Sequence, residues 1–216
     1  MTAVDFNAIT AYQRYKLMAS LIVPRPIALI TTLAEDGTVN AAPFSMFNML
    51  GEDPPIVMVS INKLADGGLK DTAAHIARAK EFVVHLADEP IAAQMHRCGE
   101  RLPRHESELA KVGLSTLPSH AVAPPRIAQA PVAFECTLWE TLETASRQIF
   151  IGRVLWLHAR DGLIDTERWR VTLTEYFPVG RFGASYYVDT RGRFAIDDAP
   201  SGEAPAHGGS DTIDKL

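Results

Sequence analysis

The sequence predicts a mostly β fold with a few helices, in which an antiparallel sheet closes into a barrel. Three strand-like runs, at residues 27–33, 39–47 and 56–61, come before the first long helix. A doubly wound parallel fold would instead alternate strands and helices along the whole chain. The second run contains Pro43, which places it at an edge or a bulge of the sheet.

The expected elements follow a simple order. A helix at residues 11–21 has apolar side chains at helical spacing and stops before a Pro-Arg-Pro turn. Asp36-Gly37, between the first two runs, is a strong hairpin signal. The remaining elements are a helix at 69–79, a strand at 81–87, a shorter helix at 89–98, a surface excursion without core elements at 99–130, and a hairpin of strands at 130–143 and 147–160 joined by Thr144-Ala145-Ser146.

Length and composition predict a single domain over residues 1–196. A chain of 216 residues that is 47% hydrophobic can bury one substantial core. Residues 197–216 are rich in Asp, Ala, Pro, Gly and Ser, so we expect a flexible tail. The N-terminus lacks the features of a secretory signal, and no apolar run approaches the roughly 20 residues that span a bilayer. We therefore expect a cytoplasmic protein with no membrane partner.

Charge and motifs exclude several functions. A formal net charge of -5, without a Lys/Arg block, argues against a nucleic-acid or anionic-membrane surface. The Rossmann GxGxxG, the P-loop and the GxSxG nucleophile elbow are absent. The seven histidines never occur as HxH, HxxxH or HExxH, so we expect no metal site. Cys136 alternates with apolar residues on a predicted strand, which favours a buried thiol over a disulfide with Cys98.

The run VNAAPFSMFN, at residues 39–48, has one small and partly polar face. Side chains alternate along a strand, which places Ala41, Pro43 and Ser45 on the same side. Such small side chains would let a planar ligand lie close to the backbone, and Ser45 could hydrogen-bond it. The alternative is an edge strand whose small residues have no ligand role, and the strand alone supports both interpretations equally.

The segment SINKLADGGLKDT, at residues 60–72, predicts a phosphate-binding cradle. Its glycines precede Lys70, Asp71 and Thr72 at a helix start, where free N–H groups and the helix dipole favour an anion. Ser60 and Lys63 could close the same pocket. The alternative is an ordinary Asp or Thr N-cap beside a solvated lysine, which leaves the preceding SINK unexplained.

Six motifs occur in the order PRPIALITT, DGTVNAAPFSMFN, VSINK, GGLKDTAAHI, EFVVHL and FPVGRFG. In this combination they resemble the flavin reductase-like proteins, whose fold is the FMN-binding split barrel, over about residues 15–187. The resemblance implies a Greek-key β-barrel that forms a homodimer with FMN near the interface. Aromatic residues Trp139, Phe150 and Trp156 on the long strands give the dimer indirect support.

The resemblance also implies an activity. It indicates an NAD(P)H-dependent FMN reductase that transfers hydride from NADH or NADPH to flavin N5, with the chemistry supplied by the cofactor. Some members supply reduced flavin to a partner monooxygenase. Others, flavoredoxin-like, hold FMN as non-catalytic electron carriers, and this remains the alternative function.

Carried over by position, the resemblance assigns the flavin contacts to two stretches of the chain. The strand at residues 39–48 would lie along the isoalloxazine, and the segment at residues 60–72 would take the ribityl phosphate, with Asp71 capping the helix. The expected cofactor-binding residues are Asn40, Ala41, Ala42, Pro43, Phe44, Ser45, Phe47, Asn48, Ser60, Asn62, Lys63, Lys70, Asp71 and Thr72.

Two further sets of residues follow from the resemblance. His158, Arg181 and Tyr186 are candidates for the nicotinamide side, although a surface arginine and a half-buried structural histidine are the alternative interpretations. His75 and His85 stand where the family often has asparagine, so any contact made by those asparagines is in doubt in this chain.

Overall fold

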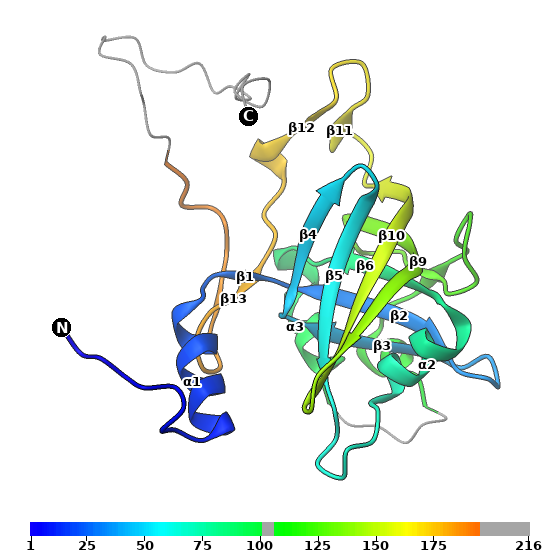
Figure 1. Cartoon of the computed structure of the whole chain (residues 1–216). Coiled ribbons are helices and arrows are strands. Elements are labelled where there is room, and N and C mark those ends of the chain that lie inside the picture. Colours follow the sequence, from blue (N-terminus) through cyan, green and yellow to red (C-terminus); the bar gives the residue numbers. More distant parts are fainter. Residues whose placement is uncertain (101–105, 195–216) are drawn as a thin grey trace, which may run out of the picture.

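The computed structural model describes residues 1–100 and 106–194 (Figure 1). The tail expected at residues 197–216 lies outside this range. Within it, no helix combines the length and the apolar character needed to cross a membrane.

The main sheet has seven strands in the order β3-β2-β6-β9-β10-β5-β4, and every neighbouring pair is antiparallel. Its edge strands, β3 and β4, are consecutive in the chain, so the curled sheet forms a barrel that is split between them. In Figure 1, β2 and β3 run across beneath the steeper β4, β5, β9 and β10. The predicted antiparallel barrel is confirmed. The strands are β2 (Ala28–Leu33), β3 (Val39–Phe44), β4 (Phe47–Glu52), β5 (Pro55–Asn62), β6 (Glu81–Leu86), β9 (Val132–Glu143) and β10 (Arg147–Ala159).

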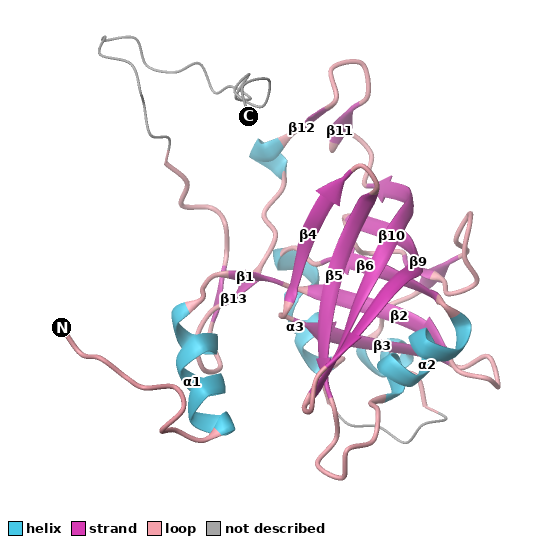
Figure 2. Ribbon diagram, in the orientation of Figure 1, coloured by secondary structure: helices cyan, strands magenta, loops and turns pink. Residues whose placement is uncertain are grey.

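Helices and short strand pairs surround this sheet (Figure 2). The helix predicted at residues 11–21 is present as α1, which is set apart to one side of the barrel. The helices are α1 (Ala11–Leu21), α2 (Asp71–Ala79), α3 (Ala92–Arg97), α4 (Glu108–Val112) and the 3-10 helices η1 (Glu89–Ile91) and η2 (Leu173–Glu175). The short strands are β1 (Arg25–Pro26), β7 (Thr116–Leu117), β8 (Arg126–Ile127), β11 (Ile164–Asp165), β12 (Arg170–Val171), β13 (Gly180–Arg181) and β14 (Tyr187–Val188).

Strand β2 is buried on both faces, which explains its nearly continuous apolar sequence. Ile30 belongs to an interior cluster that also contains Phe82 of β6, Phe150 of β10 and Ile76 of α2. Leu29, its neighbour, belongs to a second cluster, which includes buried residues of α3 and α4. The strand is therefore the wall between two parts of the core.

The run at residues 39–47 forms two strands, so the expectation of one strand is wrong. β3 ends at Phe44 and β4 begins at Phe47, with a bend at Ser45 and Met46. The carbonyl of Met46 accepts a hydrogen bond of 2.8 Å from the backbone N–H of Ser60. This bond holds the bend against β5. At the bend, the chain leaves β3, one edge strand of the split barrel, and enters β4, the other edge strand. β3 is an edge strand, as Pro43 predicted.

The segment at residues 99–130 supplies core residues, which corrects its interpretation as a surface excursion. Leu109 and Val112 of α4, together with Leu114 and Ile127, are buried in the cluster that packs on Leu29. α4 has only five residues, little more than one turn, so its sequence is too short to show a helical period.

The β9–β10 hairpin is present as predicted, but a bulge changes the direction of its last side chains. Val154 pairs with Cys136, whereas Trp156 pairs with Glu135, so Leu155 is an extra residue on β10. Val154 and Cys136 pack in the interior cluster. Strict alternation along β10 would place His158 on the face of Val154, but after the bulge Trp156 and His158 lie on the face of Glu135 instead. Cys136 is a buried free thiol, as predicted.

Candidate functional site

Strand β3 meets the first turn of α2 through a polar network. The amide nitrogen of Asn40 donates to Oγ1 of Thr72 at 2.9 Å and to Oγ1 of Thr32 at 3.2 Å. Nδ1 of His75 lies 3.0 Å from the same Thr32 hydroxyl. Thr72 is only 2% exposed. The structure thus brings Asn40 and Thr72 together, as expected for one site, and gives His75 an internal partner.

The start of α2 has the geometry of an anion-binding helix terminus. Lys70 is the N-cap residue, with extended backbone angles, and no side chain caps the helix. The N–H groups in the first turn of an α-helix have no acceptor within the helix, and its dipole favours negative charge there. Asp71 is the first helical residue, so the expectation that it caps the helix is wrong. The helix begins two residues after the start predicted at residue 69.

A second group of predicted residues lies where β5 meets the tip of the β9–β10 hairpin. Ser60 is 8% exposed, and its carbonyl accepts a hydrogen bond from the Arg147 guanidinium at 3.3 Å. Lys63 Nζ lies 2.5 Å from Glu143 Oε1, and this hydrogen bond lowers the pKa of the Glu143 carboxyl. The charge of Lys63 is therefore already balanced. Arg147 adds a cation that sequence reasoning missed, because only the pairing of β10 with β5 brings it beside Ser60.

The face of β3 expected to remain open to a ligand is covered at Ala41, whereas Pro43 on the same face is half-buried. Ala41 is fully buried in the cluster that includes Leu109 of α4. Its backbone N–H donates to the Glu108 carboxylate at 2.9 Å. Burial raises the pKa of Glu108, while this hydrogen bond lowers it. Ala41 therefore has a core role, and its contact with the cofactor stays a prediction.

The remaining predicted contact residues differ in burial: some belong to the core, others are exposed, and a third set is half-buried. Phe44 is buried in the interior cluster, with Ala42 and Phe47 packed partly buried against it. Asn48 is exposed, and its Oδ1 accepts the N–H of Met49 at 2.9 Å. Asn62 is also exposed and donates to the carbonyl of Lys63 at 3.3 Å. The residues that are half-buried at the split of the barrel are Asn40, Ala42, Pro43, Ser45 and Phe47.

Arg181 lies in β13 of the small sheet β1-β13-β14, and Tyr186 directly precedes β14. The Arg181 guanidinium donates to the carbonyl of Ala184 at 2.6 Å and lies 4.7 Å from the centre of the Tyr187 ring. Tyr186 is 71% exposed, and neighbouring Phe182 is 42% exposed. These residues form an open aromatic surface, with the arginine held in place by its own turn.

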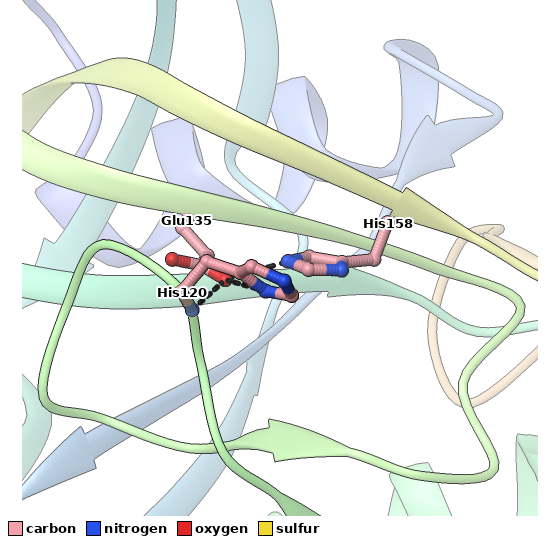
Figure 3. Close-up of side chains that lie close together, drawn as sticks. All are labelled: His120, Glu135 and His158. Carbon is pink, nitrogen blue, oxygen red and sulfur yellow. Dashed lines mark hydrogen bonds and ion pairs between the residues drawn. The ribbon is translucent and has the colours of Figure 1, made fainter.

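His158 makes its contacts with different elements. Its Nε2 lies 2.6 Å from Oε1 of Glu135, and Nδ1 of His120 lies 3.9 Å from the same oxygen (Figure 3). Glu135 is 0% exposed, and its carboxylate also accepts the backbone N–H groups of His120 and Ala121 at 2.7 and 2.6 Å. Burial lowers the pKa of His158. The three residues are 15 and 23 positions apart in sequence, so spacing motifs could not reveal the group.

His85 has a structural role. Its side chain is fully buried, with Nδ1 2.9 Å from the carbonyl of Leu29, while Nε2 accepts the N–H of Ile127 at 2.9 Å. A carbonyl can only accept, so Nδ1 carries the proton of the neutral ring. Burial lowers the pKa of His85 from 6.5 to about 4. The residue links β6 with β2 and β8.

We expect this histidine to make the protein less stable in weak acid. The unfolded chain protonates His85 below about pH 6.5 and the folded chain only near pH 4, so the unfolded state binds more protons between these values. The contribution of His85 to stability should fall by about 2 kcal/mol between pH 7.5 and pH 5. Urea unfolding across this range should show a shallower pH dependence in His85→Gln. The exposed-histidine control His96→Gln should keep the wild-type slope; an unchanged slope in His85→Gln would contradict the assignment.

Comparison with known proteins agrees with this architecture. The profile of the flavin reductase like domain matches residues 18–178. The chain is 34% identical to the 2-nitrobenzoate 2-nitroreductase NbaA of Pseudomonas fluorescens, with a TM-score of 0.84 over 95% of this chain and 100% of that one. It is 30% identical to nitrilotriacetate monooxygenase component B from Bacillus cereus, with a TM-score of 0.85 over 91% and 98%. The flavoredoxin of Desulfovibrio vulgaris (Miyazaki F), 20% identical with a TM-score of 0.72 over 94% and 100%, shares the fold.

The split antiparallel barrel and the uncapped helix start beside its open edge define a flavoprotein of the split-barrel class. The chain belongs to the flavin reductase-like family. Family membership supports a flavin cofactor.

Proposed function

We propose that this protein is an NAD(P)H-dependent FMN reductase that binds FMN at the split of the barrel. The observation that carries the proposal is the start of α2, where an uncapped helix N-terminus follows Lys70 and is tied to β3 through Asn40 and Thr72. An FMN phosphate fits this donor set, because N–H groups, a hydroxyl and a lysine complement its negative charge. Bound FMN would supply the redox chemistry by accepting hydride from NADH or NADPH.

The residues of the chain would bind and orient this cofactor. Lys70 and the first turn of α2 would hold the phosphate, while half-buried Pro43 and Ser45 of the barrel edge would line the ring system. Arg147, held beside Ser60, would add positive charge at the same end of β5. Arg181 with Tyr186 and Phe182 offers a half-buried cation beside an exposed aromatic surface for the reductant.

One relative suggests how the reduced flavin is used. Nitrilotriacetate monooxygenase component B bears the name of one part of a monooxygenase system. We propose that this chain likewise supplies reduced flavin to a flavin-dependent monooxygenase. The alternative is a flavoredoxin-like electron carrier. One observation favours this alternative. His158 and Arg181 were both expected on the nicotinamide side, but His158 contacts Glu135 of β9 and Arg181 contacts Ala184 of its own turn, so the two do not form one nicotinamide site.

The absorption spectrum of the purified protein, before and after adding FMN, tests the proposal together with NADH and NADPH oxidation. A reductase should bind FMN and oxidise at least one reduced dinucleotide when FMN is present. Tightly held flavin with negligible dinucleotide oxidation would establish the carrier function instead. A protein that neither binds FMN nor oxidises NADH or NADPH would overturn both.

We also propose that the protein is a homodimer, and α1 supports this. α1 buries none of its residues, and Tyr12 and Leu21 are 69% and 76% exposed. Isolated helices of about this length are marginally stable in water, so a partner surface would explain why α1 forms. Trp139 and Trp156 are also exposed, whereas Phe150 is fully buried and belongs to the core rather than to an interface. Light scattering at micromolar concentration should give twice the chain mass of 23.7 kDa.

A further inference from the structure

We propose that His120, Glu135 and His158 form a binding site for a zinc-like divalent transition-metal ion, separate from the flavin site. Figure 3 shows the three side chains converging from three segments: the loop between β7 and β8, strand β9 and strand β10. Their candidate ligand atoms all lie within 4.8 Å of one another. The inference does not rest on the proposed FMN reductase activity.

The distances suit a shared ion after small side-chain movements. Zinc lies about 2.0–2.2 Å from imidazole nitrogen and carboxylate oxygen, so tetrahedral ligands are roughly 3.4 Å apart. The Oε1 of Glu135 lies 2.6 Å from Nε2 of His158 and 3.9 Å from Nδ1 of His120. The first pair must open by about 0.8 Å and the second must close by about 0.5 Å, which torsions of the two imidazoles can provide.

Glu135 is held as metal-ligating carboxylates usually are. The carboxylates that bind metals are themselves hydrogen-bonded by groups that fix their orientation. Both oxygens of Glu135 accept backbone N–H groups, from His120 and Ala121, and the residue is 0% exposed. A buried carboxylate needs compensating charge or strong hydrogen bonds. The two backbone hydrogen bonds supply this compensation and fix the orientation of the carboxylate.

The two histidines are arranged to present ring nitrogens to the carboxylate. The His120 ring stacks on Trp156, with a centroid distance of 5.0 Å and an interplanar angle of 7°. The His158 and His120 rings are 4.8 Å apart. Two imidazoles and one carboxylate suit zinc, whereas magnesium and calcium prefer oxygen alone.

The site leaves room for a fourth ligand from solvent. The His120 side chain is 55% exposed, whereas that of His158 is 14% exposed, so the group opens to water on the His120 side. Three protein ligands with one open position are typical of accessible zinc sites. A bound ion would clamp the loop that carries His120 to the β9–β10 hairpin, and so would stabilise the folded state. Without an ion, His158 and Glu135 form a hydrogen-bonded pair, and His120 lies beside them.

Zinc titration of chelator-treated full-length protein, followed by calorimetry and thermal unfolding, tests the site. Wild type should bind one Zn²⁺ per chain and gain several degrees in Tm at about a hundredfold excess over Kd. His120→Ala removes an exposed ligand without touching the core and should weaken binding at least about tenfold. The double variant His120→Ala/His158→Gln should lose the saturable event and the Tm gain.

The control is His96→Ala, which removes an exposed histidine elsewhere, bonded to Tyr187, and should bind Zn²⁺ as wild type does. A parallel titration with Mg²⁺ should show no binding. The proposal is overturned if wild type shows no one-to-one uptake of Zn²⁺, or if the double variant binds it as tightly as wild type.

Discussion

Gly152→Ala should destabilise the protein by about 3 kcal/mol, a large effect for adding one methyl group. A Cβ built at Gly152 would lie 2.4 Å from Cζ of Phe82 and 3.3 Å from Cβ of Cys136. Both neighbours are fully buried, so the Phe82 ring cannot swing aside without disturbing the interior cluster. Urea unfolding should show a lower midpoint and an unchanged slope, because the compactness of the folded state is retained.

Two variants isolate the cause. Gly192→Ala adds a methyl group where nothing lies within 4 Å and should leave stability unchanged. Phe82→Leu removes the ring atoms that Gly152→Ala would meet, so the double variant should be more stable than the sum of the two single changes predicts. Wild-type stability in Gly152→Ala, or additive effects in the double variant, would show that the close approach does not limit the packing.

Lys70→Ala should weaken FMN binding by about ten- to a hundredfold, because one charge-assisted hydrogen bond is worth about 1.5 to 3 kcal/mol. The residue precedes the uncapped start of α2, where a phosphate would meet both the lysine and the helix N-terminus. Lys63→Ala should have a smaller effect, because the Lys63 ammonium is already paired with Glu143 at 2.5 Å. Fluorescence titration with FMN measures the Kd of wild type, Lys70→Ala and Lys63→Ala.

Riboflavin separates phosphate recognition from folding in this experiment. It lacks the phosphate, so wild type and Lys70→Ala should bind it almost equally. The exposed residue Lys111, which pairs with Glu100 at 3.6 Å, gives a remote control, and Lys111→Ala should bind FMN normally. Equal FMN affinity in wild type and Lys70→Ala would mean that the phosphate is held elsewhere.

The sequence predicted the elements with strong local signals. Buried strands such as β2 and β6 are mostly apolar, and Asp36-Gly37 and the turn at residues 144–146 marked hairpins. The predictions that were wrong concern features that depend on contacts with residues distant in sequence. The bend at Ser45 and Met46 is fixed by a bond to Ser60, and α4 is too short to show a period. A one-residue bulge then reversed the expected face of β10 beyond Val154.

The candidate site was predictable only in part for the same reason. The GGLKDT pattern marks a helix start from local chemistry, so it located Lys70 and Thr72 correctly at the beginning of α2. Alternation along β3 indicated that Ala41 and Pro43 share a face, but could not reveal that α4 covers Ala41. The group around Glu135 depends on pairing between strands and on a loop, which no spacing rule describes.

The hydrogen bond between Ala41 and Glu108 has a consequence for solubility. An exposed edge strand offers its outward N–H groups to strands of other molecules and so invites aggregation. On β3, the outward N–H of Ala41 is taken by the Glu108 carboxylate, and two residues further Pro43 has no N–H to offer. At two successive outward positions, this edge therefore has no free N–H group for an added strand to bind. Pro43 and the Glu108 carboxylate therefore protect this edge against β-sheet growth between molecules, while the split remains available for the proposed cofactor.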